Sequence, residues 1–145
     1  MSASFAVSVG KREAMAAIEE GVVFGLAPEG TRSYSGQLMA AKDGAAFLAT
    51  RAGVPIVPVG LVNCDRLFQN FKRLRPTTLE VRIGEPFTLP QADERVRARE
   101  LPAYTELIMA HIAALLPESY RGYYADSPAL AALLAGEDPW PECVR

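Results

Sequence analysis

The sequence predicts an α/β protein with a mixed, largely parallel sheet and flanking helices, and three observations favour this class. Residues 22–27 are almost entirely apolar, which is typical of a strand buried on both faces. A helical pattern at 12–20 joins that run to an earlier β-rich run at 5–9, the order that forms a right-handed crossover. Two later β-rich runs, at 55–61 and 79–83, extend the predicted sheet.

Helical periodicity is found in four segments, at 12–20, 42–52, 102–116 and 129–134. The first segment separates alanine, methionine and isoleucine from glutamate, as an amphipathic surface helix does. Gly21 follows it as a left-handed cap, and Gly53 ends the second segment. The third segment is the longest and carries its apolar side chains at i, i+3 and i+4 spacing.

The later strands differ in how regular they are expected to be. Pro55 and Pro58 cannot donate ladder hydrogen bonds, so residues 55–61 are expected at a sheet edge or on an irregular course. Residues 79–83 alternate apolar and charged side chains, as a half-buried strand does.

Composition excludes several classes of function. The chain has 145 residues, which fits one domain, and its formal net charge of −2 gives no sign of general nucleic-acid binding. Cys64 and Cys143 are too few and too far apart for a disulfide framework or a metal site. No nucleotide-binding G-x-x-x-x-G-K-[ST] loop and no signal peptide occur. The apolar runs are shorter than the roughly 20 residues of a membrane span, so any membrane contact is expected to be peripheral.

The motif that carries chemistry is Pro-Glu-Gly-Thr-Arg-Ser at 28–33, directly after the apolar run at 22–27. Gly30 has no Cβ, so backbone N–H groups can approach an anion closely. Arg32 offers a planar set of donors that fits a phosphate bidentately. Glu29 is expected to orient Arg32 or to accept from a substrate hydroxyl. These residues predict a site for a polyol phosphate or another hydroxylated anion.

Five ordered blocks resemble the glycerol-phosphate and lysophosphatidate acyltransferase family. They are Pro-Glu-Gly-Thr-Arg-Ser at 28–33, Lys-x-Gly-Ala at 42–45, Val-Pro-Ile-Val-Pro-Val at 54–59, Val-Arg-Ile-Gly-Glu-Pro at 81–86 and Leu-Pro-Glu-Ser-Tyr-Arg-Gly at 116–122. The resemblance implies an acyltransferase-like domain over 1–124, lacking the first elements of the family fold, and a tail at 125–145 with a short helix.

The resemblance also implies a transferase of phospholipid biosynthesis. Its donor is an acyl-thioester, acyl-CoA or acyl-carrier protein, and its acceptor is a glycerol phosphate or a lysophospholipid. No bound cofactor or metal is implied. The implied substrate-binding residues are Glu29, Gly30, Thr31, Arg32, Ser33 and Lys42. For Ser33 a role in the turn, and for Lys42 a role as a solvated lysine, are equally good readings. Residues 54–59 are a core strand that would also line the acceptor or acyl pocket.

The family's catalytic His-x4-Asp dyad is absent from this sequence, so no catalytic residue is assigned. His111 is the one histidine, and Leu116 stands five residues later. His111 borders the apolar face of the predicted helix at 102–116, which indicates a structural or surface histidine.

Two explanations of the absent dyad are open. The chain is the C-terminal portion of an active acyltransferase, or it is a phosphate-binding or lipid-binding pseudoenzyme. The predicted strand at 5–9 favours the first, because a domain that starts so abruptly leaves a sheet edge unpaired, through which it could form oligomers.

Residues 66–75 place four cations among leucines and phenylalanines. They could lay apolar side chains into a membrane interface while the cations meet anionic headgroups. The alternative, slightly favoured, is a solvated excursion between strands whose aromatics pack on the core. A phosphorylated thioester donor or an acidic carrier protein could also dock there by charge. The expected location is cytoplasmic, peripheral at the inner face of the membrane.

Overall fold

A computed structural model describes residues 10–90 and 96–145, apart from the side chains of Phe68 and Gln69. In chain order the helices and strands are α1 (Lys11–Glu19), α2 (Gly44–Ala52), β1 (Val59–Val62), α3 (Cys64–Lys72), β2 (Glu80–Ile83), α4 (Leu101–Leu115), α5 (Pro128–Ala135) and α6 (Trp140–Cys143). Short 3₁₀ turns lie at Ala98–Glu100, Glu118–Tyr120 and Gly122–Tyr124. The described part is therefore mixed α/β and mostly helical.

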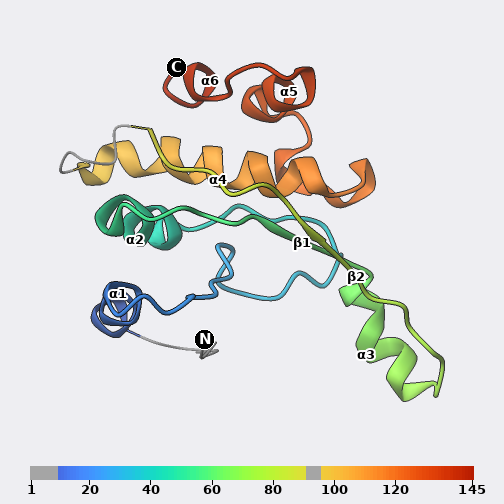
Figure 1. Ribbon diagram of the computed structural model, residues 1–145. Coiled ribbons are helices and arrows are strands. Elements are labelled where there is room, and N and C mark those ends of the chain that lie inside the picture. The colour runs from blue at the N-terminus through green and yellow to red at the C-terminus, as the bar shows by residue number, and fades with distance from the viewer. Residues whose placement is uncertain (1–9, 91–95) are drawn as a thin grey trace.

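The long helix α4 is the centre of the fold, with α5 and α6 on one side and α2 and the strands on the other (Figure 1). Its residues contribute to both core clusters. Leu107 and Ile108 pack with Ala46 of α2, and Met109 and Ala113 pack with Leu130 of α5. A helix that is apolar on most of its circumference is stable only when it is covered on several sides, and α4 is covered in this way.

The predicted helices are confirmed almost to the residue. The segments predicted at 12–20, 42–52, 102–116 and 129–134 correspond to α1, α2, α4 and α5. Gly21 has φ of +76°, the left-handed conformation predicted for it, and Gly53, predicted to end the second helix, is also left-handed with φ of +62°. The helix in the predicted tail segment is thus present, whereas the division into a domain at 1–124 and a tail at 125–145 remains a prediction.

The predicted parallel sheet is not found in the described part of the chain. The sheet there consists of β1 and β2, which pair antiparallel with Val59 opposite Ile83 and Leu61 opposite Val81. An isolated bridge between Ile56 and Phe87 continues the pairing. The strands are antiparallel because the excursion through α3 returns the chain to the end of β1, where the Asn63 side-chain amide donates to the Thr78 carbonyl at 3.1 Å.

The strand predicted at 22–27 is a second correction. This segment forms no sheet, and Val23 is 76% exposed. An extended segment becomes a strand only when a neighbour pairs its N–H and C=O groups. The neighbour predicted for it, at 5–9, lies outside the described residues. The strand predicted at 55–61 is regular only from Val59, in keeping with its two prolines, and the one predicted at 79–83 is confirmed as β2.

Candidate functional site

In the turn at residues 28–33, the side chain of Lys42 lies beside Gly30. The Gly30 N–H donates to the Ala27 carbonyl at 3.1 Å, and Gly30 has φ of +68°. A Cβ at Gly30 would lie 3.3 Å from Cδ and 3.4 Å from Nζ of Lys42. The Lys42 N–H in turn donates to the Pro28 carbonyl at 2.9 Å. Glycine is favoured here by its left-handed backbone conformation, and its missing Cβ lets the Lys42 side chain lie close to the turn.

Glu29 has a structural contact that the sequence did not indicate. Its Oε2 accepts a hydrogen bond of 2.7 Å from the Met39 N–H, ten residues further along the chain. A carboxylate that accepts from a backbone N–H makes a charge-assisted hydrogen bond. Glu29 therefore ties the two ends of the loop together and holds the turn in shape.

The other predicted site residues lie along the same loop. Thr31 and Arg32 are exposed, as is Lys42. The hydroxyls of Ser33 and Ser35 lie 3.1 Å apart, which gives Ser33 a contact within the loop. All six predicted residues thus lie in the loop at 28–42, where the Lys42 N–H bonds to the Pro28 carbonyl. Their roles in binding remain predictions.

The loop is anchored on the segment after α4. The Leu38 N–H donates to the Tyr120 carbonyl, and the Tyr123 N–H donates to the Leu38 carbonyl, both at 2.9 Å. The Ala41 N–H donates to the buried Tyr124 hydroxyl, also at 2.9 Å. Burial raises the pKa of Tyr124, so its hydroxyl stays neutral at this anchor.

Other blocks of the resemblance meet through close backbone contacts. The Gly84 N–H donates to the Pro58 carbonyl at 2.9 Å, joining the blocks at 54–59 and 81–86. Arg82 Nη1 donates to the Leu115 carbonyl at 2.8 Å, at the end of α4. A Cβ at Gly60 would lie 2.9 Å from a methyl carbon of Leu116. These contacts therefore hold the strand region against the end of α4.

His111 is part of the packing between α4 and the chain after β2. Its ring stacks on that of Phe87, with centroids 3.7 Å apart and an interplanar angle of 10°. Half-burial lowers its pKa from the usual 6.5 by desolvating the charged form. This environment agrees with the predicted structural role.

The two cysteines are both free thiols. Burial raises the pKa of Cys143 to about 12, and burial also raises the pKa of Cys64. Such thiols stay protonated at neutral pH, and a protonated thiol is a poor nucleophile.

Sequence reasoning missed the residues that hold the loop, chiefly Met39, Gly122 and Tyr124. The aromatic run at 120–124 was the available signal, because a buried tyrosine hydroxyl needs a hydrogen-bond partner. Its partner is a backbone group 83 residues away in the sequence, which no local pattern reveals.

Comparison with known proteins agrees with the motif pattern. An acyltransferase family model matches residues 6–62, which include the turn at 28–33 and Lys42. The chain is 30% identical over 119 residues to a 1-acyl-sn-glycerol-3-phosphate acyltransferase of Cocos nucifera, a match that covers 81% of this chain and 37% of the relative. It is 29% identical over 111 residues to the human 1-acyl-sn-glycerol-3-phosphate acyltransferase alpha, covering 70% of this chain and 39% of the relative. No solved structure matches the chain.

The chain therefore belongs to the acyltransferase family. Within that family its distant relatives are 1-acyl-sn-glycerol-3-phosphate acyltransferases, and it spans less than two fifths of the length of the two described above. None of the helices in the described ranges is long and apolar enough to span a bilayer.

Proposed function

We propose that the protein acts in acyl transfer from an acyl-thioester to a glycerol-phosphate or lysophospholipid acceptor, a step of phospholipid synthesis. This chain supplies the part that binds the acceptor. The observation that carries the proposal is the approach of Lys42 to Gly30, which puts an ammonium group at an exposed turn, and Gly30 is two residues from Arg32 in the sequence. Two such cations at one exposed turn are suited to a phosphate. The two relatives are named for 1-acyl-sn-glycerol-3-phosphate, a compound that contains such a phosphate.

The residues have distinct roles in this proposal. Arg32 binds the acceptor phosphate bidentately, Lys42 adds a second positive charge, and Gly30 keeps the turn open beside Lys42. Thr31 and Ser33 offer hydroxyls to the same group. Glu29, held by Met39, shapes the turn. The exposed apolar side chains of residues 57–61 offer a wall suited to an acyl chain.

The reaction needs a base that this sequence does not contain. In the family mechanism a histidine removes the proton of the acceptor hydroxyl, whose oxygen attacks the thioester carbonyl carbon. The C–S bond then breaks, the sulfur leaves as thiolate and takes up a proton, and the acyl group remains on the acceptor as an ester. His111 is stacked on Phe87 and has no aspartate five residues later. The donor is acyl-CoA or acyl-carrier protein, and the reaction belongs to the cytoplasmic face of the membrane.

The first test measures binding and turnover on the same purified chain. We expect it to bind lysophosphatidate without cleaving an acyl-thioester. Arg32→Ala should weaken binding about tenfold or more, because it removes a bidentate charge-assisted contact. The matched control is Arg97→Ala, an exposed arginine in another part of the fold. Thioester cleavage above the blank rate would refute the expectation that this chain is inactive by itself. Equal binding of lysophosphatidate by the two variants would refute the assignment of Arg32 to the phosphate site.

The absent dyad gives a second candidate, a binding module that recognises phosphate or lipid without chemistry. Sequencing the DNA directly upstream of Met1, in frame, distinguishes the two candidate functions. A coding sequence with His-x4-Asp there supports the acyltransferase. A stop codon with no such motif supports the binding module.

A further inference from the structure

The helix α3 projects from one end of the sheet, away from the helices packed around α4 (Figure 1). It forms the excursion between β1 and β2 and has nine residues. An isolated helix of this length is marginal in water, because nucleation is costly and few hydrogen bonds repay it. A helix that protrudes in this way therefore gains stability from whatever covers it.

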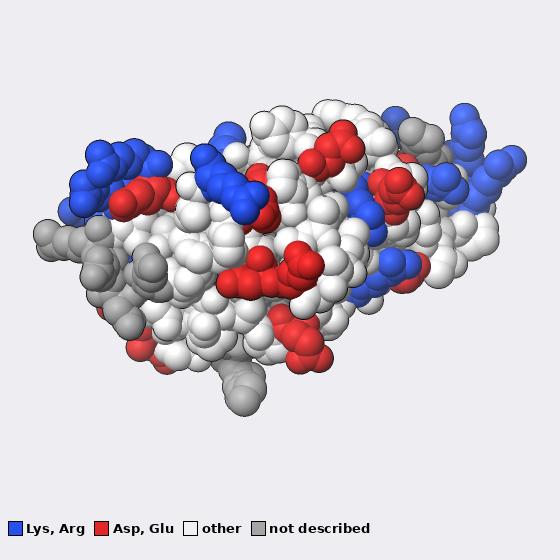
Figure 2. Space-filling view, turned by 90° about the horizontal axis from the view of Figure 1, so that it is seen from above, with Lys and Arg blue, Asp and Glu red and all other residues white. Residues whose placement is uncertain are grey.

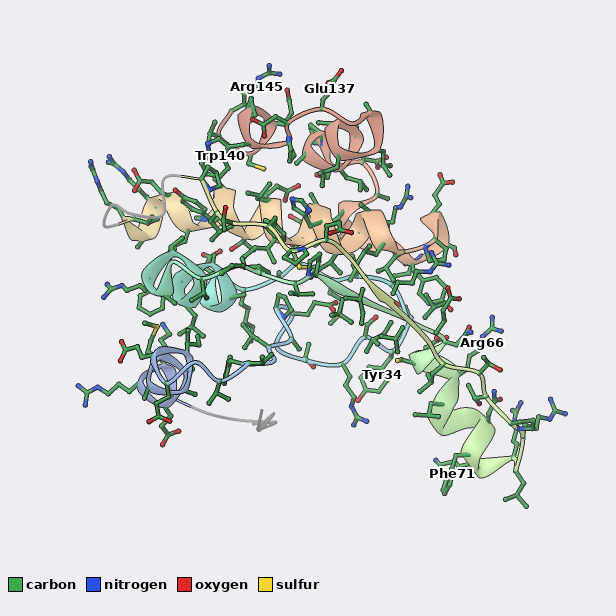
Figure 3. All side chains as sticks on the ribbon, viewed as in Figure 1. Tyr34, Arg66, Phe71, Glu137, Trp140 and Arg145 are labelled. Atoms are coloured by element: carbon green, nitrogen blue, oxygen red, sulfur yellow. The ribbon has the colours of Figure 1, made fainter. Side chains whose placement is uncertain are left out.

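The stripe, as we call it, is the set of exposed leucine and phenylalanine side chains Leu67, Phe71 and Leu74, in α3 and its C-terminal turn. Leu67 and Phe71 follow i, i+4 spacing, which places them on one face of α3, and Leu74 stands in the turn that ends the helix. Phe71 is 79% exposed and Leu74 is 94% exposed. Phe71 and Arg66 lie on different sides of α3 (Figure 3). The segment is an excursion between strands, as the favoured interpretation has it, but the exposure of Phe71 shows that this aromatic side chain does not pack on the core.

Positive charge is concentrated at the same end of the molecule. Residues 64–75 contain four cations and one carboxylate, a formal charge of +3, whereas the whole chain has −2, so the rest has −5. The cations Arg66, Lys72, Arg73 and Arg75 are all exposed. Figure 2 shows lysine and arginine side chains gathered at this end.

The tip of the excursion is held in one shape. Leu74 has φ of +50°, at a position after a helix where glycine is usual. The Asn70 side-chain amide donates to the Thr77 hydroxyl at 2.9 Å, and the Arg75 N–H donates to the Asn70 carbonyl at 2.9 Å. A leucine here costs backbone strain and, being exposed, gains no burial in the protein itself. Such an outlier indicates a role outside the fold.

We propose that α3 and its C-terminal turn, residues 64–75, dock on an anionic lipid surface. The stripe of Leu67, Phe71 and Leu74 enters the headgroup region, and the surrounding cations meet the anionic headgroups. A lipid surface admits protruding side chains without a preformed pocket, whereas a folded acidic protein needs a groove that fits them. This inference does not depend on acyl transfer, because docking requires neither substrate nor base.

The test is flotation of the full chain with vesicles of phosphatidylcholine alone and of phosphatidylcholine mixed with phosphatidylglycerol. We expect binding to the mixed vesicles only, and weaker binding as salt is raised. Arg73→Gln with Arg75→Gln should lower the partition constant about 25-fold, about fivefold for each arginine. The matched control is Arg97→Gln with Arg99→Gln, two exposed arginines outside the excursion, which should bind as the parent does.

Leu74→Gly tests the apolar stripe without harming the fold, because glycine suits the left-handed backbone at this position. It should lower the partition constant about fivefold or more while the unfolding midpoint is unchanged or higher. The control is Leu134→Gly, which removes an exposed leucine from α5. Absence of vesicle binding, equal loss in the control variants, or binding to an acidic carrier protein in place of vesicles would overturn the proposal.

Discussion

His111 shows how a single residue makes the stability of this protein depend on pH. Its ring is half-buried against Phe87, and desolvation lowers its pKa below 6.5 in the folded state. Above pH 6.5 the ring is neutral in both the folded and the unfolded chain, so the packing contributes fully. As pH falls below 6.5, the unfolded chain binds the proton more readily, and stability is lost until pH passes the lowered folded pKa.

We expect His111→Gln to flatten this dependence. The free energy of unfolding, measured by urea titration, should fall for the parent between about pH 7.5 and about pH 5.5, across the usual range of histidine titration. The variant should lose less over the same interval, although it is less stable throughout because the stack is gone. Identical slopes in the two proteins would show that carboxylates cause the dependence instead.

At the scale of elements, the site loop depends on the turn after α4. Gly122 has φ of +48°, and a Cβ there would lie 2.3 Å from the Leu38 carbonyl oxygen. Leu38 makes backbone hydrogen bonds to Tyr120 and Tyr123, on both sides of Gly122. The loop can lie this close to the turn because Gly122 has no Cβ. The glycine of the last motif block therefore lets the loop at 28–42 lie close against the turn after α4.

Gly122→Ala should destabilise the protein by about 2 kcal/mol or more, since the added methyl meets backbone that cannot move aside. The matched control is Gly53→Ala, which has φ of +62° and open space around the added carbon. That change should cost only about 1 kcal/mol of backbone strain. Equal losses of unfolding free energy in the two variants, measured by denaturant titration, would mean that the loop moves aside to accommodate the added methyl group. Weaker lysophosphatidate binding by Gly122→Ala alone would connect the anchor to the site.

At the scale of the whole molecule, the small sheet is covered on one face only. Gly60 and Val62 are buried, whereas Val59, Leu61 and Val81 are exposed and Ile83 is 70% exposed. In the described residues neither strand has a second strand beside it. An open edge next to an exposed apolar face favours association between chains.

We therefore expect the purified chain to self-associate as its concentration rises. Val81→Thr with Ile83→Thr should reduce this association, because threonine keeps strand propensity and removes apolar surface. Light scattering over a dilution series measures the change, and Leu134→Thr is the control at an exposed leucine of α5. A monomer at all concentrations, or the same reduction in the control, would contradict the expectation.

The sequence by itself determined the helices α1, α2, α4 and α5 and the motif residues. The helices follow from local rules, because apolar periodicity and the left-handed glycines Gly21 and Gly53 act within a few residues. The motif at 28–33 was visible because a glycine, a hydroxyl and a guanidinium stand together. The segment at 66–75 showed its mixed charge and apolar character, although its helix, α3, was not predicted.

Only the tertiary structure decided which partners these local elements meet. The apolar run at 22–27 reads as a buried strand, yet it forms no strand and most of it is exposed. Strand formation needs a neighbour, which the run itself cannot specify. Glu29 meets Met39, and Tyr124 meets Ala41, through contacts between segments that are separate in the sequence. Hydrogen bonds and packing between distant segments depend on the path of the whole chain, and for that reason local patterns predicted the site residues and not the contacts that hold them.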